Sequence, residues 1–270
     1  GLENPQNRED RIADKKGAAA AELAQKGVAT EATEELWSKL DEEYFIRESA
    51  VNISWHSELI IAAAGEGPIV ALKELTKIDG EGATQIFIYT KDGDFLFANT
   101  TAALERLRLN VQGARIFTSS HGYCLDTFTV LEDEGTPVGD SPKRIAEIVD
   151  ALISSLPNKH TALGAPVYRQ TRKERYFATK VLVRLSNPEN RLHSSLEINC
   201  PDHPGILATV GKLFVDESIN IKDARITTLG ERVEDLFYIT NRHDQRLVDA
   251  EEIEELCSKI EQAVETRLSI

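Results

Sequence analysis

The chain has 270 residues, of which 41% are hydrophobic, and it carries a formal net charge of −14 at pH 7. This length allows roughly two domains, and no apolar run is long enough to span a bilayer. The excess of negative charge argues against nucleic acid as a partner, because nucleic-acid phosphates would be repelled. The sequence contains three widely spaced cysteines, which indicate buried thiols in a reducing compartment. We therefore expect a cytoplasmic protein with neither a membrane nor a nucleic-acid partner.

Residues 1–66 are predicted to be helical, because they lack the alternation of apolar and polar side chains that strands show. An alanine-rich run at residues 18–24 favours a helix, and two more helices are expected at residues 31–40 and 51–64. Ser49 is the expected N-cap of the last of these helices. We interpret this segment as a connector or as the tail of a preceding domain.

From residue 67 the pattern changes to alternating strands and helices. The turn-rich residues 79–82 separate two apolar stretches, which is typical of a β-hairpin. The expected order is two strands, a helix, two strands and a helix, at residues 69–77, 83–89, 95–108, 110–118, 124–131 and from Pro142 to about residue 156. We place this first domain at residues 67–157 and a polar, basic linker at residues 158–175.

The same order of elements returns in residues 176–270. Strands are predicted at residues 177–185 and 192–200, followed by a helix from about Gly205, two strands and a final helix. At an offset of 110 residues, several identities support a true internal repeat: Asp92 with Asp202, Ala98 with Ala208, Asn110 with Asn220, and residues 114–116 with residues 224–226.

Each repeat therefore reads ββαββα, and the predicted fold class is α+β. A four-stranded antiparallel sheet backed by two helices, as in ferredoxin-like folds, buries faces of this size and order. A tight hairpin turn makes the first strand of each unit antiparallel to the second strand. We therefore expect residues 69–77 and 177–185 to fill the place of the fourth strand in their sheets.

A strand-to-helix turn in the second repeat is the strongest candidate site. Pro204 and Gly205 make a tight turn that lets a small ligand approach the main chain. The free N–H groups at the start of the following helix favour an anion such as a carboxylate. Together with a nearby carboxylate and amide they would suit a small zwitterion, and the candidate residues are Asp202, His203, Pro204, Gly205, Ile206, Leu207 and Asn220.

The first repeat has a related but altered turn. Asp94 stands at the start of the helix, where it would cap the helix and would also repel a ligand carboxylate. This second, weaker candidate site consists of Asp92, Gly93, Asp94, Phe95, Leu96 and Asn110.

No catalytic constellation stands out elsewhere in the sequence. A Gly-rich phosphate loop and clustered metal ligands are absent, so we expect neither a catalytic residue nor a metal site in these residues. The pair His243 and Asp244 stands alone in a turn-like stretch, and His56 beside Trp55 on a predicted helix indicates packing.

The Asp-x-Pro-Gly turn at Asp202, with Asn220 further on, resembles the ACT domain, a small-molecule-sensing module. A closer resemblance is to the C-terminal part of the bacterial bifunctional uridylyltransferase/uridylyl-removing enzymes that modify PII signal proteins. It rests on residues 1–5, 126–128, 224–228 and 230–237.

The resemblance implies two ACT domains that sense glutamine and switch preceding catalytic domains between uridylylation and deuridylylation of PII in nitrogen regulation. Those catalytic domains would use UTP and Mg²⁺, whereas residues 1–270 would need no cofactor. Ligand identity rests on the family alone. Two alternatives stay open: a ligand-free ACT module for interaction or dimerisation, and an enzyme in its own right.

Overall fold

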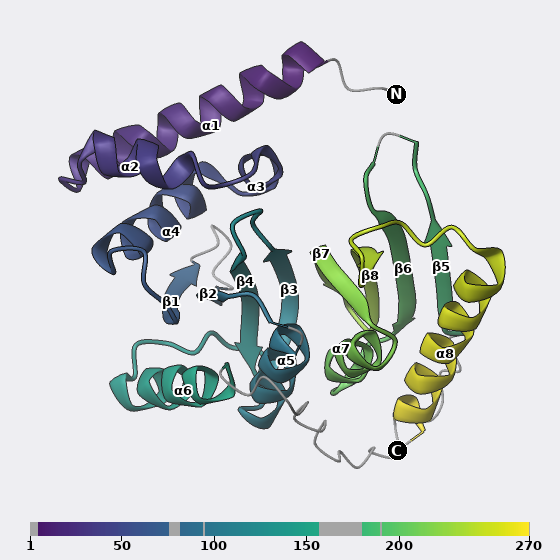
Figure 1. Cartoon of the computed structure of the whole chain (residues 1–270). Coiled ribbons are helices and arrows are strands. Elements are labelled where there is room, and N and C mark those ends of the chain that lie inside the picture. The colour runs from purple at the N-terminus through teal and green to yellow at the C-terminus, as the bar shows by residue number, and fades with distance from the viewer. Residues whose placement is uncertain (1–4, 76–81, 94, 157–179, 190, 270) are drawn as a thin grey trace.

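The computed structural model describes residues 5–75, 82–93, 95–156, 180–189 and 191–269, and Figure 1 shows their arrangement. The first part is helical, as predicted, and contains α1 (Pro5–Gln25), α2 (Thr30–Trp37), α3 (Glu42–Arg47) and α4 (Ala50–Ala62). The Ser49 side chain caps α4 by accepting a hydrogen bond from the Asn52 N–H at 3.1 Å. The short helix α3 was not anticipated from the sequence.

The first repeat unit has the predicted order of elements. It consists of β1 (Ile69–Leu75), β2 (Ala83–Lys91), α5 (Leu96–Arg106), β3 (Leu109–Phe117), β4 (Tyr123–Glu132) and α6 (Pro142–Ser155). Strand β1 pairs antiparallel with β2, from Ile69 opposite Tyr89 to Leu75 opposite Ala83. The expectation that the first strand fills the fourth place of the sheet is therefore confirmed for its described residues.

The second unit repeats this architecture with β5 (Leu182–Ser186), β6 (Ser194–Pro201), α7 (Ile206–Asp216), β7 (Ile219–Leu229), β8 (Arg232–Asn241) and α8 (Ala250–Leu268). Strand β5 pairs antiparallel with β6, again at the edge of the sheet. The predicted start of this strand at residue 177 lies outside the described residues, and so does the predicted linker at residues 158–175.

The two four-stranded sheets join into one antiparallel sheet of eight strands, in the order β1-β2-β4-β3-β7-β8-β6-β5. The junction is the pairing of β3 with β7, from Gly113 opposite Thr227 to Phe117 opposite Asp223 (Figure 1). These two strands occupy equivalent places in the repeat. The units therefore meet through equivalent edges, with an approximate twofold relation that the sequence repeat alone did not reveal.

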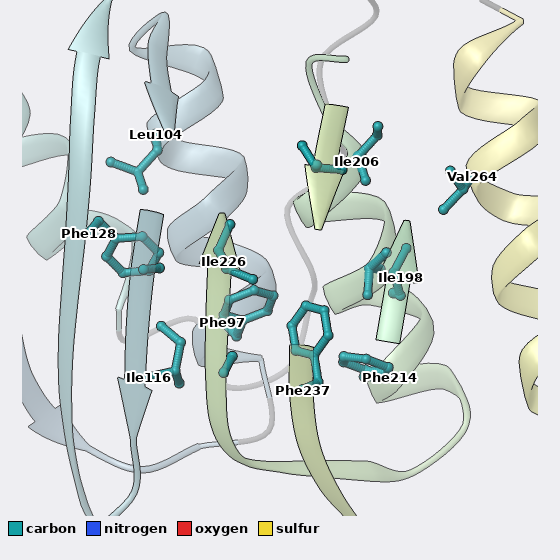
Figure 2. Packing of buried hydrophobic residues seen from close by; sticks show 14 of the residues in the cluster. Phe97, Leu104, Ile116, Phe128, Ile198, Ile206, Phe214, Ile226, Phe237 and Val264 are labelled. Atoms are coloured by element: carbon teal, nitrogen blue, oxygen red, sulfur yellow. The ribbon is translucent and has the colours of Figure 1, made fainter. Parts of the chain in front are cut away.

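Helices α5 to α8 cover one face of this sheet, and the core beneath them is continuous across both units. In Figure 2, Phe97 of α5 points toward Phe237 of β8, and the two rings meet edge to face with centroids 5.9 Å apart. Helices α5 and α7 cross closely, because a Cβ atom added at Gly211 would lie only 2.9 Å from the Ala98 Cα. The contact between the units is thus a shared core as well as a strand pairing.

Helices α1 to α4 cover the opposite face of the first unit. Strand β2 is buried on both faces, with Ile86 and Ile88 in the shared core and Phe87 and Tyr89 under the helices. His56 of α4 stacks on Phe87 with ring centroids 3.8 Å apart, and burial lowers its pKa well below the usual value. The predicted packing role of His56 agrees with this placement.

Helix α3 also reaches the second unit. Arg47 forms an ion pair with Asp223 of β7, and Glu43 lies 3.4 Å from the guanidinium of Arg191. Both arginines lie over the ring of Tyr238 at 4.5 Å from its centroid. The helical segment therefore packs against both repeat units, and not against the first unit alone.

Candidate functional site

Two cavities lie along the junction of the repeat units. The turn-202 pocket, of about 390 Å³, is lined by residues 202–208 of the second unit and by parts of α5 and β3 of the first. The turn-92 pocket, of about 220 Å³, is lined by Asp92, Gly93 and Leu96 of the first unit and by parts of α7 and β7 of the second. Each pocket therefore combines the turn of one unit with the helix and strand of the other.

The turn of the turn-202 pocket depends on Gly205. Its φ of +86° lies in the left-handed region, which favours glycine over residues with a side chain. A Cβ atom at this position would also overlap the guanidinium of Arg267, which packs against the turn. Upstream, the Asp202 N–H donates a hydrogen bond of 2.8 Å to the Glu231 carbonyl oxygen and anchors the end of β6.

The first turn of α7 opens on this pocket. Ile206 N–H donates to the His203 carbonyl at 3.4 Å, and Thr209 N–H donates to the Gly205 carbonyl at 2.9 Å as the helix begins. Leu207 and Ala208 line the pocket between these two donors. Main-chain N–H groups at this place in a helix lack an acceptor within the helix, and together with the helix dipole they attract an anion.

The opposite wall comes from the first unit, including Thr101, Glu105 and Asn110. The sequence analysis grouped Asn220 with Asp202, because both belong to the same repeat. The structure instead places Asn110 beside the Asp202 turn and Asn220 in the turn-92 pocket. The prediction that Asn220 lies beside Asp202 is therefore wrong. Because the units are related by an approximate twofold axis, each pocket takes its asparagine from the other unit.

The turn-92 pocket has most of its polar groups engaged within the protein. Asp92 Oδ1 accepts a hydrogen bond from the Gly93 N–H at 2.8 Å and lies 3.3 Å from the Cys124 sulfur. Asn220 Nδ2 donates to Asp244 Oδ1 at 3.2 Å, and Lys222 forms an ion pair with the same carboxylate at 2.7 Å. Phe95 lies at the N-cap of α5, and Asp94 is outside the described residues.

A buried aspartate lines each pocket at equivalent places in the repeat. Burial raises the pKa of Asp126 in the turn-92 pocket to about 8, although its carboxylate accepts a hydrogen bond from the Phe117 N–H at 3.2 Å. Burial likewise raises the pKa of Asp235 in the turn-202 pocket to about 7. Both pockets thus have a carboxyl group that is protonated at a higher pH than an exposed aspartate.

Two charged side chains at the turn-202 pocket were missed by the sequence analysis. Glu105 of α5 lines the cavity, and Arg267 near the end of α8 forms an ion pair with it at 2.8 Å. Arg267 Nε also donates a hydrogen bond of 2.8 Å to the Pro204 carbonyl. Neither residue belongs to a motif, and Arg267 lies 63 positions after the proline that it contacts.

The described residues contain no group of three or more His, Cys, Asp or Glu side chains that could hold a metal ion. Asp244 pairs with Lys222, and His243 Nε2 accepts a hydrogen bond from Arg242 at 3.1 Å. Among the described helices, none has both the length and the apolar character needed to cross a bilayer.

Comparisons with known proteins identify the relatives of this chain. Residues 7–59 match the family model for the uridylyltransferase GlnD fifth domain, and residues 194–258 match the model for the ACT domain. Over 265 residues the chain is 43% identical to a bifunctional uridylyltransferase/uridylyl-removing enzyme of Stutzerimonas stutzeri (strain A1501), covering 98% of the chain. The chain is a relative of these bifunctional enzymes. The corresponding enzyme of Pseudomonas fluorescens is 40% identical over 271 residues and matches 100% of the chain.

The chain spans 29% of the first relative and 30% of the second, so it corresponds to less than a third of each. The predicted resemblance to this family and the predicted α+β fold with an ACT domain are confirmed. Among solved structures, an aspartate kinase from Synechocystis is similar over 61% of this chain and 25% of its own, with 17% identity and a TM-score of 0.34.

Proposed function

We propose that this chain is the amino-acid-sensing region of a bifunctional uridylyltransferase/uridylyl-removing enzyme, with glutamine as the effector. Its binding would switch catalytic domains of the same enzyme between uridylylation and deuridylylation of PII in nitrogen regulation. The observation that carries the proposal is the turn-202 pocket, where the first turn of α7 and acidic residues of both units line one cavity of about 390 Å³. The choice of glutamine rests on the resemblance to the family.

The pocket offers a complementary group for each end of a zwitterion. The N–H groups of Leu207 and Ala208 would receive the carboxylate, where the dipole of α7 favours a negative charge. Asp202 and Asn110 at the rim would accept hydrogen bonds from the ammonium or the side-chain amide. The turn-92 pocket would be the weaker second site, because its carboxylate and amide already have partners within the protein.

Coupling to catalysis would follow from the position of the pocket between the units. A ligand that binds better to one arrangement of the two units shifts the population toward that arrangement. Helix α3 contacts the second unit through the ion pairs of Arg47 with Asp223 and of Glu43 with Arg191, and it belongs to the segment that matches the fifth-domain model. Residues 5–62 would therefore carry the change in arrangement to the catalytic domains.

Calorimetric titration of the chain with L-glutamine tests this proposal. We expect the wild type to bind and Asp202→Ala to bind about tenfold more weakly, since one charge-assisted hydrogen bond is lost. Asp92→Ala, the equivalent change in the turn-92 pocket, is the matched control and should leave the stronger binding unchanged. Equal binding by wild type and Asp202→Ala would refute this site, and absence of binding by the wild type would refute sensing by this chain.

A second candidate function is pairing between chains. Strands β1 and β5 are the two edges of the eight-stranded sheet, and exposed edges can pair with another chain. Sedimentation velocity across a range of concentrations distinguishes the two functions. A stable dimer that shows no response to glutamine would favour the interaction module.

A further inference from the structure

Asp235 places a carboxyl group on an otherwise apolar face of β8. Its side chain is 3% exposed and lies on the same side of the strand as Val233 and Phe237, which belong to the shared core beneath the helices. Ile198 of β6 lies opposite Asp235 in the neighbouring strand. A carboxyl group in such surroundings is unfavourable unless both of its oxygens have partners.

One of the two oxygens of Asp235 has a structural role. Residues 226 and 227 of β7 have no paired residue in β8, although the two strands pair on either side of them. At this place Asp235 Oδ1 accepts a hydrogen bond of 3.3 Å from the Thr227 N–H. This contact accounts for one oxygen and leaves the other unexplained.

The second oxygen, Oδ2, opens on the turn-202 cavity. It accepts no hydrogen bond from the described part of the chain, yet it does not belong to the unpartnered polar atoms there that are closed off from solvent, so it keeps accessible surface. Because the Asp235 side chain lies beneath the helices and lines this cavity, that surface faces the cavity. Glu105 Oε2 differs, since it is closed off from the cavity.

A second carboxylate lies close to Asp235. Burial is the largest cause of the raised pKa of Asp235, and the negative charge of Asp202 adds to the rise. Asp202 and Asn110 are exposed residues of the turn and of β3, and both line the same cavity. Two carboxylates that repel each other across one cavity favour a cation between them. An ammonium group has three donors, which matches acceptors on these three residues.

We infer that Asp235 recognises the amine of an α-amino acid in the turn-202 pocket, by accepting a hydrogen bond from the ammonium group through Oδ2. Asp202 and the side-chain oxygen of Asn110 accept from the other donors of the same group. The ligand carboxylate lies at the first turn of α7, as in the proposed function. The inference rests on that function and adds the buried residue that determines the preference for an amine.

The turn-92 pocket has an aspartate at the equivalent place but different surroundings. Asp126 lines this pocket together with Lys222, whose ammonium group pairs with Asp244 at 2.7 Å. A cationic group of the protein itself disfavours a second cation in the same cavity. The described lining of the turn-202 pocket contains no lysine, and its two arginines, Arg106 and Arg108, come from the end of α5 and the turn after it. Selection of an amine is therefore a property of the turn-202 pocket.

The test compares L-glutamine with glutaramate, the same five-carbon monoamide without its α-amino group, by calorimetric titration of the chain. We expect the wild type to bind glutamine at least about tenfold more tightly than glutaramate, as is usual for a hydrogen bond between charged groups. Asp235→Asn keeps an acceptor for the Thr227 N–H and loses the charge. In this variant the preference should fall to within about threefold, chiefly through weaker binding of glutamine.

The ratio of the two affinities separates recognition from support. A loss of packing or of the Thr227 contact would weaken both compounds alike and leave their ratio unchanged. Asp216→Asn makes the same substitution at an exposed position of α7 that lines neither pocket, and it should change neither affinity. If Asp235→Asn does not fold, Asp235→Ser, which also removes the charge and offers a hydroxyl oxygen, should give the same fall in the ratio.

An unchanged ratio in a folded Asp235 variant would overturn the inference and leave glutamine sensing intact, because Asp235 would then serve only to accept the Thr227 N–H. Equal binding of the two compounds by the wild type would overturn the inference in the same way. Failure of the wild type to bind glutamine would overturn the proposed function, and the inference with it. A preference that disappears in the Asp235 variants and persists in Asp216→Asn would support both.

Discussion

Gly205 satisfies two requirements that are independent of each other. Its backbone has a φ of +86°, and the space beside its Cα is filled by the Arg267 guanidinium. We expect Gly205→Ala to lower the free energy of unfolding by about 3 kcal/mol, since it adds a steric overlap to the strain of a left-handed alanine. Urea unfolding followed by circular dichroism measures the change.

Gly230 provides the control for this prediction. It also has a positive φ, of +64°, but a Cβ atom there would meet nothing within 4 Å. Gly230→Ala should therefore lower the free energy of unfolding by only about 1 kcal/mol, because it adds backbone strain without a steric overlap. Equal losses in the two variants would mean that Arg267 moves away from the turn at little cost.

The raised pKa of Asp126 predicts that the stability of the protein depends on pH. Its pKa rises from an ordinary value of 3.8 to about 8 in the folded protein because it is buried. Between these values the folded state binds a proton that the unfolded state has released, so Asp126 makes stability fall as pH rises, by about 1.4 kcal/mol per pH unit. Above about pH 8 the stability contributed by Asp126 is fully lost, and below pH 3.8, the ordinary pKa of an aspartate, it is fully present.

Asp126→Asn removes this titration and keeps an acceptor for the Phe117 N–H. The variant should be more stable than the wild type at pH 8, and the difference should shrink as the pH is lowered toward 4. Asp150→Asn, at an exposed position of α6, should show no such trend. A constant difference between Asp126→Asn and the wild type from pH 4 to pH 8 would contradict the assignment.

At the scale of residues, the sequence located the turns but did not show which side chains meet across them. Asn110 and Asn220 were recognised as equivalent, yet chain proximity suggested the wrong partner for each, because the repeat is silent about how its two copies dock. Glu105 and Arg267 carry no local signal, since an acidic residue in a helix and an arginine near a helix end are both common. Only tertiary contact distinguishes them.

At the scale of elements, the crossing of α5 and α7 depends on small residues. A Cβ atom at Gly211 would lie 2.9 Å from the Ala98 Cα and 3.0 Å from the Phe97 ring. We expect Gly211→Ala to destabilise the protein by about 1–3 kcal/mol, because the two helices must move apart or the phenylalanine must leave its rotamer. Chemical denaturation gives the magnitude.

Gly17 in α1 is the matched control, because nothing lies within 4 Å of an added Cβ atom there. Gly17→Ala should stabilise the protein by about 0.5–1 kcal/mol through helix propensity alone. The two substitutions are chemically identical, and their effects on the free energy of unfolding should have opposite signs. A stabilising Gly211→Ala would show that the helices are not in close contact.

The elements that the sequence predicted well are those with long periodic patterns. Helix α6 and strands β4 and β6 were located to within a few residues, because their apolar faces repeat clearly. Helix α3 was missed because it has only six residues, too few to establish a period. Its identity as a helix comes from packing, with Tyr44 and Phe45 buried against the first unit.

For the whole molecule, the position of β3 and β7 in the centre of the sheet can be tested by hydrogen exchange. Each of these strands has a neighbour on both sides, whereas β1 and β5 each have one. Amides of β3 and β7 that take part in the junction should exchange as slowly as those of β2 and β8. Exchange at the rate of the edge strands would indicate that the two units separate readily in solution.

The repeat predicted the architecture of each unit, but it did not predict that the two sheets would join into one. An internal duplication shows that two copies share a fold, and it contains no information about which edges pair. The pairing of Gly113 with Thr227 requires that both edges be free and that the helices above them fit, as Gly211 and Ala98 do. These are properties of two surfaces together, so neither sequence segment reveals them alone.

Since each pocket takes its turn from one unit and its opposite wall from the other, a complete pocket exists only when both units are present. Here the two halves are tethered in one polypeptide, so their encounter is intramolecular and its effective concentration does not fall on dilution. Under the proposed sensing function, the response would depend on the concentration of the ligand and not on the abundance of the protein. Changes in expression level would then leave the set point of the response where it is.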